Sequence, residues 1–135
     1  GADVLVTSTP ARAPVVPLTT PPPGLFIAAV GADSPGKQEL TAAFTARCTV
    51  VADVLHQCIH VGELQHPIHA GLLTKEEVHA ELGAVLCGHR PGRTRPEEAT
   101  PYDSTGTALQ DVAVGFEVLE AARASGLGQS ISLGS

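Results

Sequence analysis

The sequence predicts an α/β fold with a mainly parallel sheet and flanking helices. Short apolar segments rich in Val, Ile and Ala alternate along the chain with segments whose apolar residues have helical spacing. The apolar segments are continuous rather than alternating, which is typical of strands covered on both faces, as in parallel sheets. With 135 residues, 43% of them hydrophobic, the chain is large enough to form about one domain with its own core.

The first half of the chain is predicted to contain three strands, at residues 2–8, 25–30 and 49–52. Residues 10–24 hold six of the eleven prolines. They are predicted to form a loop, because proline lacks the N–H group that helices and sheets use. A Pro-Gly turn follows the second strand, and a short helix is expected near residues 38–46.

The middle of the chain is predicted to be mainly helical. Helical spacing covers residues 53–61, whereas residues 62–73 are expected to be irregular. Thr74 and Glu77 have the spacing of a capping box, which predicts a helix from that point to about Leu86.

The last predicted elements are a short strand and a long helix. A polar loop at residues 88–98 leads to the strand at 100–104. In residues 106–124 apolar side chains recur at i, i+3, i+4, i+7 and i+10, which is one face of an α-helix. The tail from Ser125 is rich in Gly and Ser.

Charge and composition exclude several classes of protein. Eight Lys and Arg against fourteen Asp and Glu give a net charge of −6, without the basic surface that nucleic-acid binding requires. The longest apolar run, residues 25–30, is far shorter than the ~20 residues of a membrane span, and no signal peptide is recognisable. Three cysteines without paired spacing favour a reducing compartment, so we expect a cytoplasmic protein. The absence of methionine and a start directly on a strand pattern lead us to expect a fragment.

Polar side chains follow three of the predicted strands, at the ends where parallel sheets bind ligands. Thr7 and Ser8 are suited to a cofactor ribose or phosphate, and a partly desolvated Asp33 to a general base near neutrality. Each residue also has a structural interpretation. Thr7 and Ser8 can simply end a strand, Asp33 can form an Asx-turn before Pro-Gly, and Ser104 or Thr105 can cap the next helix.

The histidines and cysteines do not predict a metal site. His56 and His60 have the i, i+4 spacing of a helical ligand pair, but no third ligand accompanies them, so solvated histidines are favoured. We expect Cys48, Cys58 and Cys87 to act as small hydrophobic core residues.

Five segments, in this order and at these separations, resemble the ornithine cyclodeaminase/mu-crystallin family. The segment around Asp33 is the most distinctive of them, and the resemblance covers residues 2–124. The segments are ADVLVTSTP at 2–10, AVGADSPGKQEL at 29–40, HAELG at 79–83, PGRT at 91–94 and DSTGTALQD at 103–111.

The resemblance implies a homodimer with a substrate domain and a Rossmann domain that binds NAD or NADP. Residues 1–124 would be the C-terminal part of the Rossmann domain, and residues 125–135 the start of the return to the substrate and dimerisation domain. The resemblance places Asp33 at the catalytic acid/base position and Thr105 near the substrate. The residues it assigns to the cofactor are Thr7, Ser8, Ile27, Ala28, Ala29, Val30 and Ser104.

The implied activity is NAD(P)-dependent conversion of ornithine to proline with loss of ammonia. One alternative is an imine reductase or alanine dehydrogenase of the same family, acting on a cyclic imine or a small amino acid. A second is a non-catalytic, crystallin-like protein that binds NAD(P)H or another small ligand, and a third is a stand-alone interaction module. The crystallin branch lacks an aspartate at the position of Asp33, which favours the enzymes. The family's phosphate loop lies outside this chain, so NAD and NADP are not distinguished and the chain alone is expected to be inactive.

Overall fold

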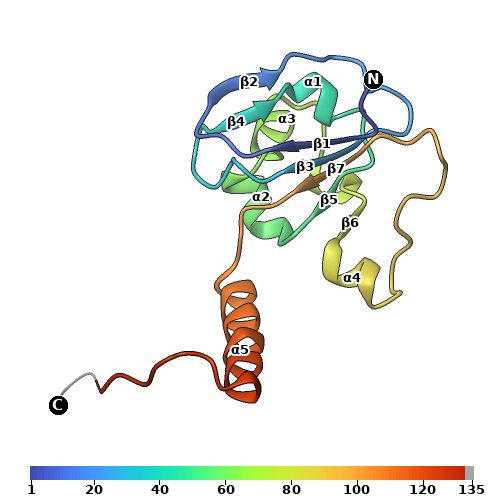
Figure 1. Ribbon diagram of the computed structural model, residues 1–135. Coiled ribbons are helices and arrows are strands. Elements are labelled where there is room, and N and C mark those ends of the chain that lie inside the picture. The colour runs from blue at the N-terminus through green and yellow to red at the C-terminus, as the bar shows by residue number, and fades with distance from the viewer. Residues whose placement is uncertain (133–135) are drawn as a thin grey trace. The chain divides into compact units, whose positions relative to one another are not determined.

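The computed structural model of the chain describes residues 1–132 and contains a five-stranded sheet in the order β1-β3-β7-β5-β6 (Figure 1). Every pairing in this sheet is parallel, which confirms the predicted α/β, Rossmann-like fold class. The strands are β1 (Val4–Thr7), β3 (Phe26–Ala29), β5 (Val51–Ala52), β6 (Ala80–Glu81) and β7 (Thr100–Asp103).

The register brings the carboxyl ends of three neighbouring strands level with one another. Thr7 pairs with Ala29, and Ala29 pairs with Asp103, so β1, β3 and β7 end at the same side of the sheet. On the far side of β7, Ala52 at the end of β5 also pairs with Asp103. The residues that follow these strands therefore meet at one end of the sheet.

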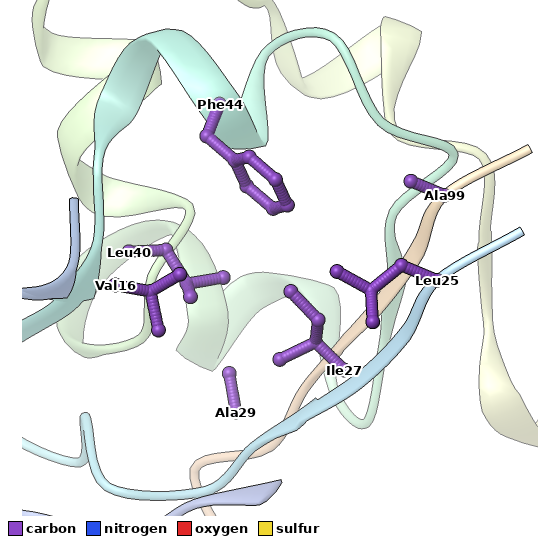
Figure 2. Close-up of a cluster of buried hydrophobic side chains, with 7 residues drawn as sticks. All are labelled: Val16, Leu25, Ile27, Ala29, Leu40, Phe44 and Ala99. Atoms are coloured by element: carbon purple, nitrogen blue, oxygen red, sulfur yellow. The ribbon is translucent and has the colours of Figure 1, made fainter. Parts of the chain in front are cut away.

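One face of the sheet carries the hydrophobic core. Helix α1 (Ala42–Thr45) packs there, and Figure 2 shows the Phe44 ring pointing from α1 toward Leu25 and Ile27. Helix α2 (Leu55–Val61) and the start of α3 (Gln65–His69) pack on the neighbouring part of the same core. The two core clusters consist of Val16, Leu25, Ile27, Ala29, Leu40, Phe44 and Ala99, and of Val50, Ala52, Cys58, Leu64 and Val78.

The predicted covering of strands on both faces is wrong for β1. Val4 and Val6 remain 61% and 64% exposed, because no helix of residues 1–105 packs on their side of the strand. β1 also has a single neighbour, β3, in the sheet.

The proline-rich loop predicted at residues 10–24 is partly a strand. β2 (Arg12–Val16) pairs in parallel with β4 (Gln38–Leu40) and forms a second, two-stranded sheet. The register shifts between Arg12 and Val16, which accommodates Pro14 without requiring its missing N–H. β4 also occupies the start of the helix predicted near 38–46, so that only α1 remains helical, with Thr41 as its N-cap.

Residues 62–86 differ from the prediction in two respects. The segment 62–73, expected to be irregular, contains α3. The capping box at Thr74 and Glu77 is present, but it begins only a 3-10 helix, η1 (Lys75–Glu77), followed by β6 and by α4 (Leu82–Leu86). Pairing of β6 with β5 overrides the local helical preference, because it buries Val78 and Ala80 against the sheet.

The helix predicted at residues 106–124 is confirmed as α5 (Ala108–Ser125). A capping box formed by Thr107 and Gln110 begins it, and Gly126, in the left-handed conformation at φ 64°, ends it. α5 belongs to a second unit, which begins at Gly106 and is distinct from the unit of residues 1–105, and none of the helix residues is buried. The end of the tail, residues 133–135, lies outside the described residues.

None of the helices within residues 1–132 has the length and apolar character needed to cross a lipid bilayer.

Candidate functional site

Residues at or just beyond the carboxyl ends of β1, β3 and β7 form what we call the strand-end cluster: Thr7, Val30, Gly31, Ser104 and Thr105. The Val30 N–H donates to the Thr7 carbonyl at 2.9 Å, and the Ser104 N–H donates to the Ala29 carbonyl at 3.0 Å. These bonds extend the strand pairing by one residue and hold the cluster at the carboxyl end of the sheet, where parallel sheets bind ligands.

The Thr7 hydroxyl is bonded to a buried carboxylate, that of Glu39. Thr7 Oγ1 donates to Glu39 Oε2 at 2.7 Å, and the Gly31 N–H donates to the same oxygen at 3.0 Å. The Thr9 N–H donates to the other oxygen at 2.6 Å, and Glu39 itself is 0% exposed. Glu39 therefore binds three groups at the ends of β1 and β3, and the hydroxyl proton of Thr7 is already used in one of these hydrogen bonds.

Gly31 leaves room for that carboxylate. A Cβ atom at this position would lie 2.5 Å from the Thr9 nitrogen and would clash with the Glu39 carboxylate. A side chain at residue 31 is therefore incompatible with the arrangement around Glu39.

Asp33 lies just beyond the cluster and is 51% exposed. Its Oδ1 accepts from Lys37 Nζ at 2.6 Å and from Ser34 Oγ at 2.8 Å, and Lys37 also donates to the Gly31 carbonyl at 3.4 Å. Hydrogen bonds from Lys37 and then Ser34 hold the pKa of Asp33 below its ordinary value. Within the described residues, the expectation that Asp33 is partly desolvated, with a pKa near neutrality, is therefore wrong. The Asp33 carboxylate is open to water and paired with the ammonium group of Lys37.

Ser104 and Thr105 are bonded to Asp53, which directly follows β5, and neither of them caps α5. Ser104 Oγ donates to Asp53 Oδ2 at 3.1 Å, and the Thr105 N–H donates to the same oxygen at 2.8 Å. The N-cap of α5 is Thr107, so the interpretation of Ser104 or Thr105 as the cap is wrong.

Two further buried carboxylates, Glu63 and Asp103, accept backbone hydrogen bonds next to the strand-end cluster. Asp103 accepts the N–H groups of Glu63 and Leu64 at 3.0 and 2.9 Å. Glu63 in turn accepts the N–H groups of Glu39 and Leu40 at 2.6 and 3.0 Å. Burial raises the pKa of each of these two carboxyl groups to about 7. The chain of bonds from Asp103 through Glu63 to Glu39 joins the end of β7 to the end of β1.

The sequence analysis missed Glu39, Asp53 and Glu63 as parts of the site. Asp103 was expected among the polar residues at this end of the sheet, but no role was assigned to it. Glu39 and Asp103 lie inside two of the five segments that carry the family resemblance, which was an available signal. Glu63 lies in a segment predicted to be irregular, and nothing in its local sequence indicates burial.

The remaining residues assigned to the cofactor are distributed unevenly. Ile27 and Ala28 lie inside β3, paired on both sides, and Ile27 is 0% exposed in the core. Ala29 ends the strand, Val30 is exposed just beyond it, and Ser8 is exposed after β1. Val30 and Ser8 are therefore the accessible members of this group.

The histidine and cysteine contacts are structural. The rings of His56 and His60 meet edge to face, with centroids 5.0 Å apart. In the described part of the chain, no group of three or more His, Cys, Asp or Glu side chains is arranged to hold a metal ion. Cys58 is buried as expected and Cys48 half-buried, with burial raising the pKa of Cys48 to about 12. Cys87 is exposed, so the expectation of a core residue is wrong there.

An apolar pocket of about 360 Å³ opens on the other face of the sheet. Phe26, Val51 and Tyr102 from the strands line it together with Leu82 and Val85 of α4. It contains none of the carboxylates described above, so the strand-end cluster is the better candidate for chemistry.

Comparison with known proteins identifies the family. The model of the ornithine cyclodeaminase/mu-crystallin family matches residues 1–126. The chain belongs to this family. The alanine dehydrogenase of Archaeoglobus fulgidus is 45% identical over 129 residues, which cover 96% of this chain and 40% of that protein. The iminosuccinate reductase of Paracoccus denitrificans is 41% identical over 132 residues, which cover 98% of this chain and 41% of that protein. This family member thus spans about 40% of the length of the relatives that it matches.

Solved structures agree with this assignment. An archaeal alanine dehydrogenase dimer with bound NAD superimposes with a TM-score of 0.87 at 44% identity, covering 98% of this chain and 41% of that one. The Δ1-pyrroline-2-carboxylate reductase of Thermococcus litoralis, in complex with NADH and L-proline, gives a TM-score of 0.89 at 27% identity, covering 96% of this chain and 41% of that one. The relatives are NAD(P)-dependent oxidoreductases and cyclodeaminases, and the family is NAD(P)-dependent.

The strand-end cluster of this family member fits the nicotinamide and ribose half of NAD(P) better than the phosphates. It offers hydroxyl and backbone groups at strand ends. Lys37, which lies beside it, is already paired with Asp33 at 2.6 Å, and the surrounding carboxylates would repel phosphate.

Proposed function

We propose that the whole protein that carries this chain is an NAD(P)-dependent enzyme acting on a small amino acid or its cyclic imine. The observation that supports this best is the juxtaposition of Asp33 with the strand-end cluster in a member of an NAD(P)-dependent family. A carboxylate beside a cofactor pocket can exchange a proton with the amine of a bound substrate.

In this proposal the cofactor is bound through Thr7, Ser8, the backbone of residues 27–30 and Ser104. When bound, it supplies the hydride acceptor or donor for the reaction. Its phosphates are held by parts of the whole protein beyond residues 1–132, since Lys37 is paired with Asp33. We further propose a homodimer, because the archaeal alanine dehydrogenase was solved as a dimer, and a Rossmann domain that ends near residue 124.

Asp33 is proposed as the acid/base, and its environment determines the order of events. Because the Lys37 hydrogen bond lowers its pKa, Asp33 is a carboxylate at neutral pH and first acts as an acceptor for the substrate amine. Substrate and the rest of the protein would exclude water from Asp33, and desolvation raises a carboxyl pKa. The same group would then be able to return the proton, while Thr105 contacts the substrate.

Ornithine cyclisation to proline with release of ammonia is the first candidate reaction. It has no net redox change, because the hydride removed from the substrate is returned to the cyclic imine. A second candidate is net dehydrogenation or reduction, and the names of the relatives at 41% and 45% identity favour it. In that case the hydride removed or added is not returned, and NAD(P)H is produced or consumed in equal amount.

The test uses the whole protein, its Asp33→Asn variant and a matched control, Asp111→Asn on exposed helix α5. NADH and NADPH are titrated by fluorescence, ammonia release is followed with ornithine, and NAD(P)H turnover is followed with alanine and cyclic imines. We expect both variants to bind cofactor, and Asp33→Asn alone to lose activity by about 10²–10⁴-fold.

The outcomes distinguish between the candidate functions. Ammonia release without net NADH turnover supports the cyclodeaminase reaction, and stoichiometric NAD(P)H turnover supports the reductase or dehydrogenase. Cofactor binding without any turnover would support the crystallin-like alternative. The absence of cofactor binding would refute the proposed function altogether.

A further inference from the structure

The two residues after β7 direct their N–H and O–H groups into the chain itself. The Ser104 N–H donates to the Ala29 carbonyl at 3.0 Å, and its hydroxyl donates to Asp53 at 3.1 Å. The Thr105 N–H donates to Asp53 at 2.8 Å. The Thr105 hydroxyl can donate its proton to Asp53 Oδ1 or to Gln57 Oε1, each of which lies 3.3 Å away. A hydroxyl has one proton and two lone pairs, so both side chains retain lone pairs but no free proton.

We propose that Asp53 is a positioning residue that makes Ser104 and Thr105 hydrogen-bond acceptors toward the bound ligands. This site would then select ligand groups that donate N–H, namely the carboxamide of the nicotinamide and the ammonium of an amino-acid substrate. The inference rests on the proposed function, because it takes Ser104 to lie beside the nicotinamide and Thr105 beside the substrate.

Asp53 is well fixed for this role. Its Oδ1 accepts from the Val54 N–H at 2.6 Å and from Cys58 Sγ at 3.1 Å, while Oδ2 accepts from Ser104 and Thr105. Its own N–H donates to the Asp103 carbonyl at 2.9 Å, which ties the start of α2 to the end of β7. Turning the carboxylate away would leave several donors without partners, so the direction of the Ser104 proton is set by the fold.

The same arrangement occurs at the end of β1, two strands away. Thr7 Oγ1 donates to Glu39 at 2.7 Å, so that this hydroxyl, too, presents only lone pairs. Thr7 and Ser104 are both nearly buried, with 6% and 8% of their surface exposed. With strands spaced ~4.8 Å apart, the two acceptors lie roughly 10 Å from each other, across the site.

The test compares NADH with its 3-acetylpyridine analogue, which keeps the carbonyl group but lacks the carboxamide N–H donors. Dissociation constants are measured by calorimetry on the whole protein, on Asp53→Ala, on Ser104→Ala and on the control Asp111→Asn. We expect the wild type and the control to prefer NADH by about tenfold, since an unpaired acceptor costs that order of affinity. In Asp53→Ala the freed Ser104 proton can bond to the carbonyl of either ligand, so NADH and the analogue should bind with about the same affinity. In Ser104→Ala the preference also falls, and a variant that combines Asp53→Ala with Ser104→Ala shows no further change.

A purely structural role for Asp53 would weaken both ligands equally and leave the preference at its wild-type value, and that result would overturn the proposal. Equal binding of the two ligands by the wild type would also overturn it. If Asp53→Ala does not fold by circular dichroism, Asp53→Ser replaces it, because a serine can still accept from Val54 but does not reach Ser104. Failure of the wild type to bind NADH at all is a separate result, which would refute the proposed function and this inference with it.

Discussion

Replacement of Gly31 by alanine tests whether the Glu39 carboxylate holds the strand ends together. The added Cβ would lie 2.5 Å from the Thr9 nitrogen and would overlap the carboxylate, so Glu39 must move. Glu39 accepts three hydrogen bonds, from Thr7, Thr9 and Gly31. Hydrogen bonds to charged groups contribute about 1.5–3 kcal/mol each, and loss of two of them would destabilise the fold by about 3–6 kcal/mol. That is a large fraction of the ~5–15 kcal/mol stability of a typical domain.

The assay is urea unfolding of the chain followed by circular dichroism. With a slope of about 1–3 kcal/mol per M, Gly31→Ala should lower the midpoint by roughly 2 M. The matched control is Gly83→Ala in α4, where an added Cβ meets no atom within 4 Å. Because alanine is the better helix former, the control should gain about 0.5–1 kcal/mol. A Gly31→Ala variant within about 1 kcal/mol of the wild type would refute the reasoning, since it would mean that Glu39 can move without losing its partners.

Three further predictions concern pH, a surface ion pair and the core. Burial raises the pKa values of Glu63 and Asp103 to about 7, so the folded state binds more protons than the unfolded state between about pH 4 and 7. Urea midpoints should therefore fall as the pH rises through that range, and the fall should be smaller in Glu63→Gln, which lacks one of the two groups. Lys37→Met removes the main cause of the lowered Asp33 pKa; that pKa should rise in an NMR titration while stability changes by less than about 1 kcal/mol, because Asp33 is 51% exposed. Phe44→Ala should cost about 3–5 kcal/mol in calorimetry, since Phe44 is fully buried against the sheet, and a smaller loss would indicate that the core repacks.

The elements that were predicted correctly are those whose local pattern and tertiary environment agree. The short apolar segment 25–30 and the short segment 100–104 were both predicted as strands, and they form the neighbouring strands β3 and β7. Residues 106–124 carry a helical repeat, a Thr-Gln capping box and a terminal glycine, all of which are local signals. Propensity and periodicity act over neighbouring residues, so they are readable without knowledge of the fold.

The incorrect predictions fell where a distant partner decided the structure. The proline-rich segment forms β2 only because β4 offers a parallel edge, and the capping box at Thr74 begins only a short turn because β6 pairs with β5. Asp33 was expected to be partly desolvated, but its exposure depends on what surrounds the sheet end, which its own neighbours in sequence do not determine.

The sequence by itself determined the fold class, the family and the positions of Asp33, Thr7 and Ser104 at strand ends, because those follow from local patterns and from motif identity. Only the tertiary structure revealed which carboxylates hold these residues. Glu39 lies 32 positions from Thr7, and Asp53 lies 51 positions from Ser104, yet each pair is in hydrogen-bond contact. A hydrogen bond depends on distance and angle in space, which the parallel register imposes and which no sequence spacing encodes. The direction of each hydroxyl proton, and with it the kind of ligand group that the site can bind, is therefore a property of the fold.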